Sequence, residues 1–359
     1  MRSGFGCHDL AIQRWQCVEG LQVPTMTAKK LLIANRGEIA VRVIEAASEL
    51  GFSTVAIFSA DDSNSLHTIR ADEAHQLPGA GVAAYLDGDA IIAIARRTNC
   101  VGIHPGYGFL SENAAFARCC DEAAIKFIGP RADLLELFGD KVRARVFANK
   151  CGVPVIEGSA KPTSRAEAHE FFDAIAGDDG IVIKAVVGGG GRGMRVVRLR
   201  DDLDEAHQRC QSEARAAFGN GDVYVERFMP AARHVEVQIL GDRAGNIAHL
   251  WERECTIQRR HQKLVEVAPS PGISEAIRTN LLDAATRIAT AARYESLGTF
   301  EFLVDTDGGD HARFVFIEAN PRLQVEHTVT EEVTGVDLVR AQIEIAFGSS
   351  LIELGLSAP

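Results

Sequence analysis

Residues 181–197 read Ile-Val-Ile-Lys-Ala-Val-Val-Gly-Gly-Gly-Gly-Arg-Gly-Met-Arg-Val-Val, and this stretch decides the fold. The apolar, β-branched runs on either side of the glycines predict two strands joined as a hairpin. Glycines adopt positive φ and let backbone amides approach phosphate oxygens closely. The loop lacks the Gly-Lys-Ser/Thr ending and the following helix of a P-loop. We therefore expect a flexible flap that closes over a nucleotide.

Lys184 lies within the first strand of this hairpin, between Ile183 and Ala185. A lysine among buried apolar side chains is unfavourable unless an anion pairs with it. We interpret Lys184 as a contact to nucleotide phosphates. The alternative is a flexible hairpin tip with a lysine whose amine reaches water.

The chain before the flap alternates short apolar runs with stretches of helical periodicity. Strands are predicted at 31–34, 54–58 and 101–103, and helices at 38–50, 89–98 and 112–124. This alternation is typical of a Rossmann-like α/β domain built on a parallel sheet.

The chain around and after the flap is richer in strands. A helix at 203–218 and a strand at 223–227 complete a small α+β lid. The period-two alternation at 234–240, 247–252, 299–305 and 314–320 predicts an antiparallel sheet, with helices at 275–293 and 336–347. We expect no further packed element in the tail.

Two glutamates stand in the middle of apolar strands, Glu301 in Thr-Phe-Glu-Phe-Leu-Val and Glu318 in Phe-Val-Phe-Ile-Glu-Ala-Asn. A buried carboxylate is costly unless it is paired, protonated or bound to a cation. Strand alternation places Glu318 and Asn320 on one face. Two carboxylates and an amide oxygen form a hard oxygen site suited to Mg²⁺ or Mn²⁺. Pairing of each glutamate with an arginine on a solvent face is the alternative.

Two polar runs supply further candidate side chains. Residues 320–327 place Arg322, which can hold a planar oxyanion, close to Glu326, a possible general base. Residues 252–263 offer donors for ribose, phosphate or an anion at Gln258, His261 and Lys263. A solvated loop and a surface charge run are the respective alternatives.

The bulk composition excludes several classes of protein. The chain has 359 residues and a net charge of -11, which argues against nucleic-acid binding. Its eight cysteines show neither a Cys-x-x-Cys pair nor zinc spacing, so we expect reduced thiols and a cytoplasmic protein. No apolar run approaches the ~18 residues of a membrane helix. We expect residues 1–26 to be a disordered extension, with Met26 as the natural start.

Several short segments together resemble biotin carboxylase. They include Ile-Ala-Asn-Arg-Gly-Glu-Ile-Ala at 33–40, His-Pro-Gly-Tyr-Gly-Phe-Leu-Ser-Glu-Asn at 104–113 and Gly-Asp-Lys at 139–141. The glycine loop and the runs at 233–236, 258–263 and 320–327 complete the resemblance, which covers residues 30 to about 350. Other ATP-grasp enzymes share the loop and the metal site, but not the 104–113 segment.

The resemblance implies an N-terminal biotin carboxylase domain over 27–140 and an ATP-grasp domain over 145–347, with its lid at about 155–228. Residues 348–359 would begin a C-terminal segment that is largely missing, including an arginine for biotin. The implied ATP-binding residues are Lys141, Lys184, Gly190, Gly191, Met194, Glu226, Arg227, Phe228, Met229, His234, Gln258 and His261. The implied metal ligands are Glu301, Glu318 and Asn320, and the implied bicarbonate residues are Lys263, Arg322, Gln324 and Val325, with Glu326 as base.

The implied reaction is ATP-dependent carboxylation of biotin by bicarbonate through carboxyphosphate, as the biotin carboxylase subunit of an acyl-CoA carboxylase such as acetyl- or propionyl-CoA carboxylase. Since no Met-Lys-Met biotinylation site is present, the biotin would sit on a separate carrier protein or on a missing segment. A carboxyltransferase subunit would use the product, and a missing C-terminal part would weaken a homodimer. The alternatives are a non-catalytic ATP-binding remnant or assembly module, and another ATP-grasp ligase of the carbamoyl-phosphate type.

Overall fold

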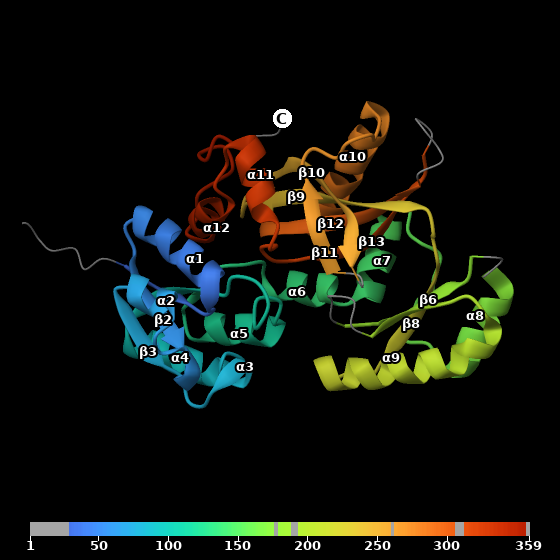
Figure 1. Cartoon of the computed structure of the whole chain (residues 1–359). Coiled ribbons are helices and arrows are strands. Elements are labelled where there is room, and N and C mark those ends of the chain that lie inside the picture. Colours follow the sequence, from blue (N-terminus) through green and yellow to red (C-terminus); the bar gives the residue numbers. More distant parts are fainter. Residues whose placement is uncertain (1–28, 176–178, 188–192, 260–261, 306–311, 357–359) are drawn as a thin grey trace, which may run out of the picture.

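The computed structural model describes residues 29–175, 179–187, 193–259, 262–305 and 312–356. It contains three sheets, which lie in three parts of the molecule (Figure 1). The expected disordered extension at 1–26 lies outside the described residues. No helix among the described residues is both long enough and apolar enough to cross a bilayer.

The N-terminal sheet is fully parallel, with the strand order β3-β2-β1-β4-β5, and confirms the predicted Rossmann-like winding. Its strands are β1 (Lys30–Ile33), β2 (Ser53–Phe58), β3 (Glu73–Gln76), β4 (Cys100–His104) and β5 (Lys126–Phe127). Its helices are α1 (Gly37–Glu49), α2 (Leu66–Arg70), α3 (Gly81–Ala84), α4 (Gly88–Arg97) and α5 (Ala114–Glu122).

The predicted helix at 112–124 is shorter than expected. Its N-cap is Asn113, whose side chain accepts a hydrogen bond of 2.9 Å from the amide of Phe116. An asparagine at this position satisfies a free amide of the first turn and so favours a helix start there. Glu112 therefore lies in a turn before the helix rather than inside it.

The lid is a three-stranded antiparallel sheet with the order β7-β6-β8, in which β6 and β7 form the predicted hairpin. It consists of α8 (Arg165–Ile175), β6 (Ile181–Ala185), β7 (Met194–Val197), α9 (Leu203–Phe218) and β8 (Val223–Arg227). Its small core, which includes Ile181, Val197 and Val225, is a separate cluster of buried side chains. The helices α6 (Ala132–Gly139) and α7 (Lys141–Lys150) precede the lid.

The third sheet is antiparallel, with the order β11-β10-β9-β12-β13. Its strands are β9 (Ala232–Gly241), β10 (Ile247–Arg259), β11 (Gln262–Val267), β12 (Ser296–Asp305) and β13 (Phe314–Asn320). Its helices are α10 (Glu275–Ala292), α11 (His327–Thr334) and α12 (Leu338–Ala346). The sequence pattern did not predict β11, an edge strand whose side chains are mostly exposed.

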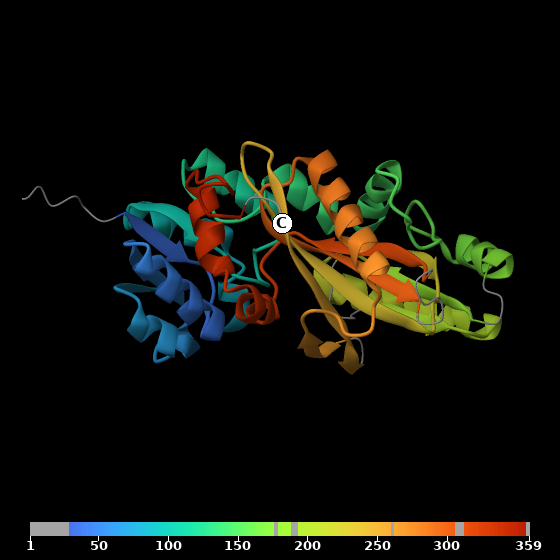
Figure 2. The same ribbon diagram turned by 90° about the horizontal axis from the view of Figure 1, so that it is seen from above.

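One face of this sheet carries the main core. Val235, Val237, Phe300 and Phe302 pack against α6, α7 and α10, and α10 crosses this face in Figure 2. Strand alternation sends the intervening side chains of β9 and β12 to the opposite face. The tail after α12 is packed, contrary to expectation, because Leu351 is buried in a second core with α1 and α12.

Candidate active site

A row of charged side chains crosses the sheet on the face away from α10. Arg253 of β10 lies opposite Glu236 of β9, which lies opposite Glu301 of β12, which lies opposite Glu318 of β13. Directly opposed residues share a face, and like charges in such positions repel. Three adjacent carboxylates therefore require cations among them.

Lys263 supplies the central cation. Its Nζ lies 2.5 Å from Glu236, 3.1 Å from Glu301 and 2.6 Å from a carboxylate oxygen of Glu326. Burial alone would lower the pKa of Lys263, but Glu301 and Glu236 raise it. Burial likewise favours a raised pKa at Glu301, yet Lys263 and His234 hold that pKa well below its usual range. Lys263 and Glu301 are therefore both charged.

His234 also reaches this row. It lies on β9, two residues before Glu236. Its Nδ1 lies 2.9 Å from Nε2 of Gln258, a nitrogen that can only donate. His234 Nε2, which contacts Glu301, therefore carries the hydrogen that it donates to the carboxylate. The structure thus brings together His234, Gln258 and Glu301, three of the predicted site residues.

The predicted metal ligands lie together at the edge of this row. Glu301 and Glu318 are register neighbours, and Asn320 Nδ2 donates to Glu301 Oε1 over 2.6 Å. Glu318 also contacts the amine of Lys141. The two carboxylates and the amide oxygen of Asn320 offer hard oxygen donors from adjacent strands, which fit Mg²⁺ or Mn²⁺.

Lys141 begins α7 beside the base of the glycine flap. Its amide donates to the carbonyl of Val186 over 3.3 Å. Burial and the nearby charge of Lys184 lower the pKa of Lys141 to about 8. Two neighbouring lysines that repel one another favour an anion between them, so the pair suits nucleotide phosphates.

Glu226 holds the second of these lysines. The carboxylate is fully buried and lies 2.5 Å from Lys184 Nζ and 3.3 Å from Arg145 of α7. Arg145 is only 5% exposed and stacks over the ring of Tyr224. Sequence reasoning placed Glu226 at the adenine hinge and missed Arg145, because nothing in α7 itself signals a partner in the lid.

The rest of the predicted hinge lies at the end of β8 and directly after it. The amides of Arg227 and Phe228 donate to the carbonyls of Glu157 and Gly180, over 2.8 Å and 3.1 Å. Met229 is half-buried directly after them. On β7, Met194 lies opposite Lys184 in register. Three other predicted ATP-binding residues lie outside the described residues: Gly190, Gly191 and His261.

The predicted bicarbonate residues lie in the loop after β13. Arg322 Nη1 donates to Gln324 Oε1 over 2.9 Å, and Gln324 Nε2 donates to Thr299 over 3.0 Å. The Nε of Arg322 contacts Glu112 of the N-terminal domain. The side chain of Val325 is 60% exposed, whereas Glu326 is buried beside Lys263.

Sequence reasoning assigned no role to Glu236, Arg253 or Glu112. Alternation in 234–240 places His234 and Glu236 on one face, which was an available signal for Glu236. Arg253 could not be found in this way, because its partner is set by the register between two strands. Oxygen and sulfur atoms of Glu236, Cys255 and Glu326 also lie within 4.8 Å of one another. The amine of Lys263 contacts two of these groups, Glu236 and Glu326.

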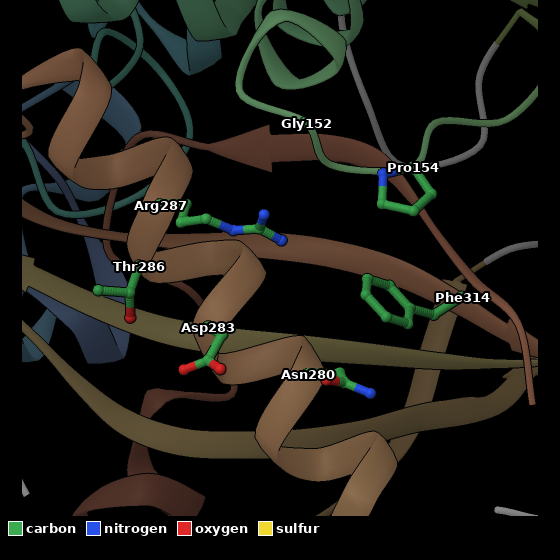
Figure 3. Close-up of a pocket in the computed structure, with 7 residues that line it drawn as sticks. All are labelled: Gly152, Pro154, Asn280, Asp283, Thr286, Arg287 and Phe314. Atoms are coloured by element: carbon green, nitrogen blue, oxygen red, sulfur yellow. The ribbon is translucent and has the colours of Figure 1, made fainter. Parts of the chain in front are cut away.

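A cavity of about 600 Å³ lies on the other side of the sheet. It is lined by α10 side chains, including Asp283 and Arg287, and by Pro154 and Phe314 (Figure 3). Because α10 covers the core face, this cavity is separated from the charged row by the sheet itself. It contains none of the predicted site residues.

Comparisons with known proteins agree with this geometry. Residues 27–135 match the family model described as biotin carboxylase, N-terminal domain. Residues 140–354 match the one described as carbamoyl-phosphate synthase L chain, ATP binding domain. The chain is 51% identical to pyruvate carboxylase of Bacillus subtilis over 92% of its own length, and 53% identical to the human mitochondrial enzyme over 91%. It spans 28% of the length of each of these two relatives.

Solved structures give the same result. The biotin carboxylase domain of Hydrogenobacter thermophilus 2-oxoglutarate carboxylase is 44% identical with a TM-score of 0.86, over 90% of this chain and 70% of that one. Biotin carboxylase from Campylobacter jejuni is 43% identical with a TM-score of 0.86, over 90% of this chain and 72% of that one. The N-terminal match and these structures favour biotin carboxylase over a ligase of the carbamoyl-phosphate type. With its parallel N-terminal sheet, its lid and its charged antiparallel sheet, the chain belongs to the biotin carboxylase family.

Proposed function

We propose that this chain is the ATP-binding and bicarbonate-binding part of a biotin carboxylase, which carboxylates biotin at the expense of ATP. The observation that carries the proposal is the position of Lys263. Its amine contacts Glu301, one of the predicted metal ligands. The same amine contacts Glu326, which lies in the loop of the predicted bicarbonate residues. One cation thus links the nucleotide side of the site to the anion side. The related Hydrogenobacter domain forms a complex with MgADP and bicarbonate, which supports this assignment.

The nucleotide phosphates would lie between Lys141 and Lys184. Both amines face carboxylates, Glu318 and Glu226, which hold them in place. Glu301, Glu318 and Asn320 would hold Mg²⁺ or Mn²⁺, which neutralises phosphate charge when bound. Cations on both sides of the triphosphate favour transfer of its terminal group.

Bicarbonate would lie between Arg322 and Lys263. Glu326 is the proposed base that takes the proton of bicarbonate, which frees an oxygen to attack the terminal phosphorus of ATP. The new bond gives carboxyphosphate, and ADP leaves. Lys263 donates to Glu326 over 2.6 Å and therefore orients the carboxylate. The lid would exclude water that otherwise hydrolyses the intermediate.

The partners in this proposal are a biotin carrier protein, a carboxyltransferase and a second copy of the chain. The curated relatives above are pyruvate carboxylases, and one similar structure is a long-chain acyl-CoA carboxylase. An acyl-CoA acceptor therefore stays a prediction. So does a cytoplasmic location, since the human relative is mitochondrial.

The experiment is ATP hydrolysis measured with and without bicarbonate and with and without free biotin. We expect turnover that requires bicarbonate and rises with biotin. MgATP binding without bicarbonate-dependent turnover would instead identify a nucleotide-binding module. No binding of MgATP would contradict both.

Lys184→Ala tests the phosphate site in the same assay. A charged hydrogen bond contributes about 1.5–3 kcal/mol, so we expect MgATP affinity to fall at least about tenfold. Lys161→Ala is the control, because this lid lysine is 73% exposed and pairs with Glu167 at the surface. Unchanged affinity in Lys184→Ala would contradict the phosphate role.

A further inference from the structure

The segment 104–113 carries the most specific part of the sequence resemblance, yet the proposed function gives it no task. Its Glu112 reaches out of the N-terminal domain and contacts Nε of Arg322. We propose that Glu112 is a positioning residue that fixes the orientation of Arg322 for bicarbonate. This inference rests on the proposed function, and it assigns the N-terminal domain an indirect part in substrate binding, through Arg322.

The hydrogen bonds of Arg322 show what Glu112 determines. Nε is taken by Glu112, and Nη1 donates to Gln324 Oε1 over 2.9 Å and to the Leu323 carbonyl over 3.2 Å. Within the described parts of the chain, Nη2 makes only a longer bond, 3.3 Å, to Asn320 Oδ1. A guanidinium has five N–H donors in a rigid plane, so fixing Nε and Nη1 also fixes where Nη2 points. Nη2 is then the nitrogen best placed to bind an anion.

The backbone around Glu112 is well suited to this role. The amide of Ser111 donates to Gly108 over 2.9 Å, and the amide of Asn113 donates to Leu110 over 3.1 Å. Asn113 then caps α5, and the Phe109 ring stacks on Tyr85 with centroids 5.2 Å apart. Glu112 therefore projects from a turn that is fixed on both sides, rather than from a free loop.

A second contact ties this segment to the first strand of the domain. Asn35, which follows β1, donates through Nδ2 to the carbonyls of Pro105 at 2.6 Å and Tyr107 at 2.8 Å. Between them, Gly106 has φ +64°, and a Cβ there would lie 2.9 Å from Asn35 Nδ2. Asn35 therefore holds the start of the segment whose far end holds Arg322.

Two other roles for Glu112 make different predictions. A carboxylate that only neutralises Arg322 would weaken anion binding, so its removal would strengthen bicarbonate binding. If the carboxylate only joins two domains, its removal would lower both the stability of the protein and its affinity for MgATP. A positioning residue affects bicarbonate alone, and an uncharged acceptor of the same shape replaces it.

The variants Glu112→Ala and Glu112→Gln separate these roles in the bicarbonate-dependent ATPase assay. We expect Glu112→Ala to raise the KM for bicarbonate about tenfold, with the KM for MgATP within about twofold. Glu112→Gln keeps an acceptor for Nε and should restore most of the bicarbonate affinity. Glu136→Ala is the control, since this exposed glutamate pairs with Arg118 on the surface. Equal effects of both Glu112 variants, or a lower bicarbonate KM in Glu112→Ala, would overturn the inference.

A measurement without turnover keeps the inference separate from the proposed function. In ¹H–¹⁵N spectra of the full chain, the Arg322 Nε–H signal can be assigned from its loss in Arg322→Lys. We expect it to be protected from solvent exchange in wild type and in Glu112→Gln, and to lose that protection in Glu112→Ala. Protection that is unchanged in Glu112→Ala would overturn the positioning role. A wild type without bicarbonate-dependent turnover, but with a protected signal, would contradict the proposed function only.

Discussion

Arg253 is the largest fully buried side chain of the charged row, with no exposed surface. Its guanidinium bonds to Glu236 over 2.6 Å, to Gln238 over 2.9 Å and to Thr330 over 2.8 Å. Such a buried pair adds little net stability compared with apolar residues, but removing one partner leaves a buried charge without compensation. Arg253 thus allows Glu236 to remain ionised beneath Lys263.

Arg253→Ala should therefore lower the free energy of unfolding by roughly 3–5 kcal/mol. Denaturant unfolding followed by circular dichroism measures this loss. Arg209→Ala is the matched control, because Arg209 pairs with Glu205 on the surface of α9 and should show no measurable change. A loss in Arg253→Ala as small as that of the control would contradict the account of the row.

The sequence predicted the parts of this site that depend on local pattern. Alternation within one strand placed Glu301 and Glu318 on the sheet, and the structure puts them opposite one another. The links between strands were not predictable in this way. Glu236 lies opposite both Arg253 and Glu301 only because of the register of β9, which long-range packing sets.

At the scale of elements, β12 depends on a close approach that only glycine allows. A Cβ at Gly298 would lie 2.0 Å from the Tyr294 hydroxyl and 3.0 Å from the carbonyl of Asn320. Tyr294 is fully buried and donates to Leu297 over 3.1 Å, so it cannot move aside at low cost. The glycine therefore sets how tightly β12 packs beside the predicted metal ligands.

We expect Gly298→Ala to lower the free energy of unfolding by about 1–3 kcal/mol, the usual cost of overpacking. MgATP affinity should fall as well, because Asn320 lies at the clash. Gly139→Ala serves as the comparison, since a Cβ at the end of α6 meets no atom within 4 Å. Thermal unfolding and nucleotide titration of both variants check the expectation, and equal behaviour would refute it.

His104 at the end of β4 gives the fold a dependence on pH. Complete burial, with Arg42 and His327 nearby, lowers the pKa of His104 to about 3, and its Nδ1 accepts from the amide of Gly106 over 3.0 Å. The unfolded chain takes up this proton below about pH 6.5, whereas the folded chain does not. The contribution of His104 to stability is therefore complete above pH 6.5 and is lost progressively as the pH falls towards 3.

From pH 7 to pH 5 this single group accounts for a loss of about 2 kcal/mol. Asparagine at position 104 offers Gly106 the same kind of acceptor without titrating. His104→Asn should therefore lose about 2 kcal/mol less between these pH values. Denaturant unfolding at both pH values measures the difference, and parallel losses in the two proteins would contradict it.

The predictions of helices and strands were confirmed where the local sequence pattern determines the element. They were wrong or incomplete where a cap or a neighbouring strand determines it. The parallel and antiparallel strands follow from apolar runs and alternation, and their types are confirmed. The helix at 112–124 was predicted too long, because the apolar periodicity hid the cap at Asn113. The edge strand β11 was not predicted, since pairing with β10, rather than its own pattern, makes it a strand.

At the scale of the whole molecule, one core joins the N-terminal domain to the large antiparallel sheet. Leu31 and Ile33 of β1 belong to the same cluster of buried side chains as Leu297 of β12 and Leu338 of α12. The lid has its own core, which does not share these residues. We infer that the first two units unfold together, while the lid opens separately at lower cost.

Leu338→Ala should lower the free energy of unfolding by about 2–5 kcal/mol, because the side chain has no exposed surface. Hydrogen exchange followed by mass spectrometry should show lost protection in both β1 and β12. Val225→Ala in the lid, equally buried, should affect β6 and β8 only. Loss of protection confined to α12 in Leu338→Ala would show that the two units are not coupled.

The interlocking of Asn35 with Gly106 limits how this architecture can change. A side chain at position 106 would collide with Asn35. Another residue at position 35 would leave the carbonyls of Pro105 and Tyr107 without the hydrogen bonds that Asn35 donates. These positions are 70 or more residues apart in the chain. A single substitution at either one therefore destabilises the turn unless the other position also changes. A designer who transplants the turn onto a different parallel sheet must therefore carry the asparagine with it.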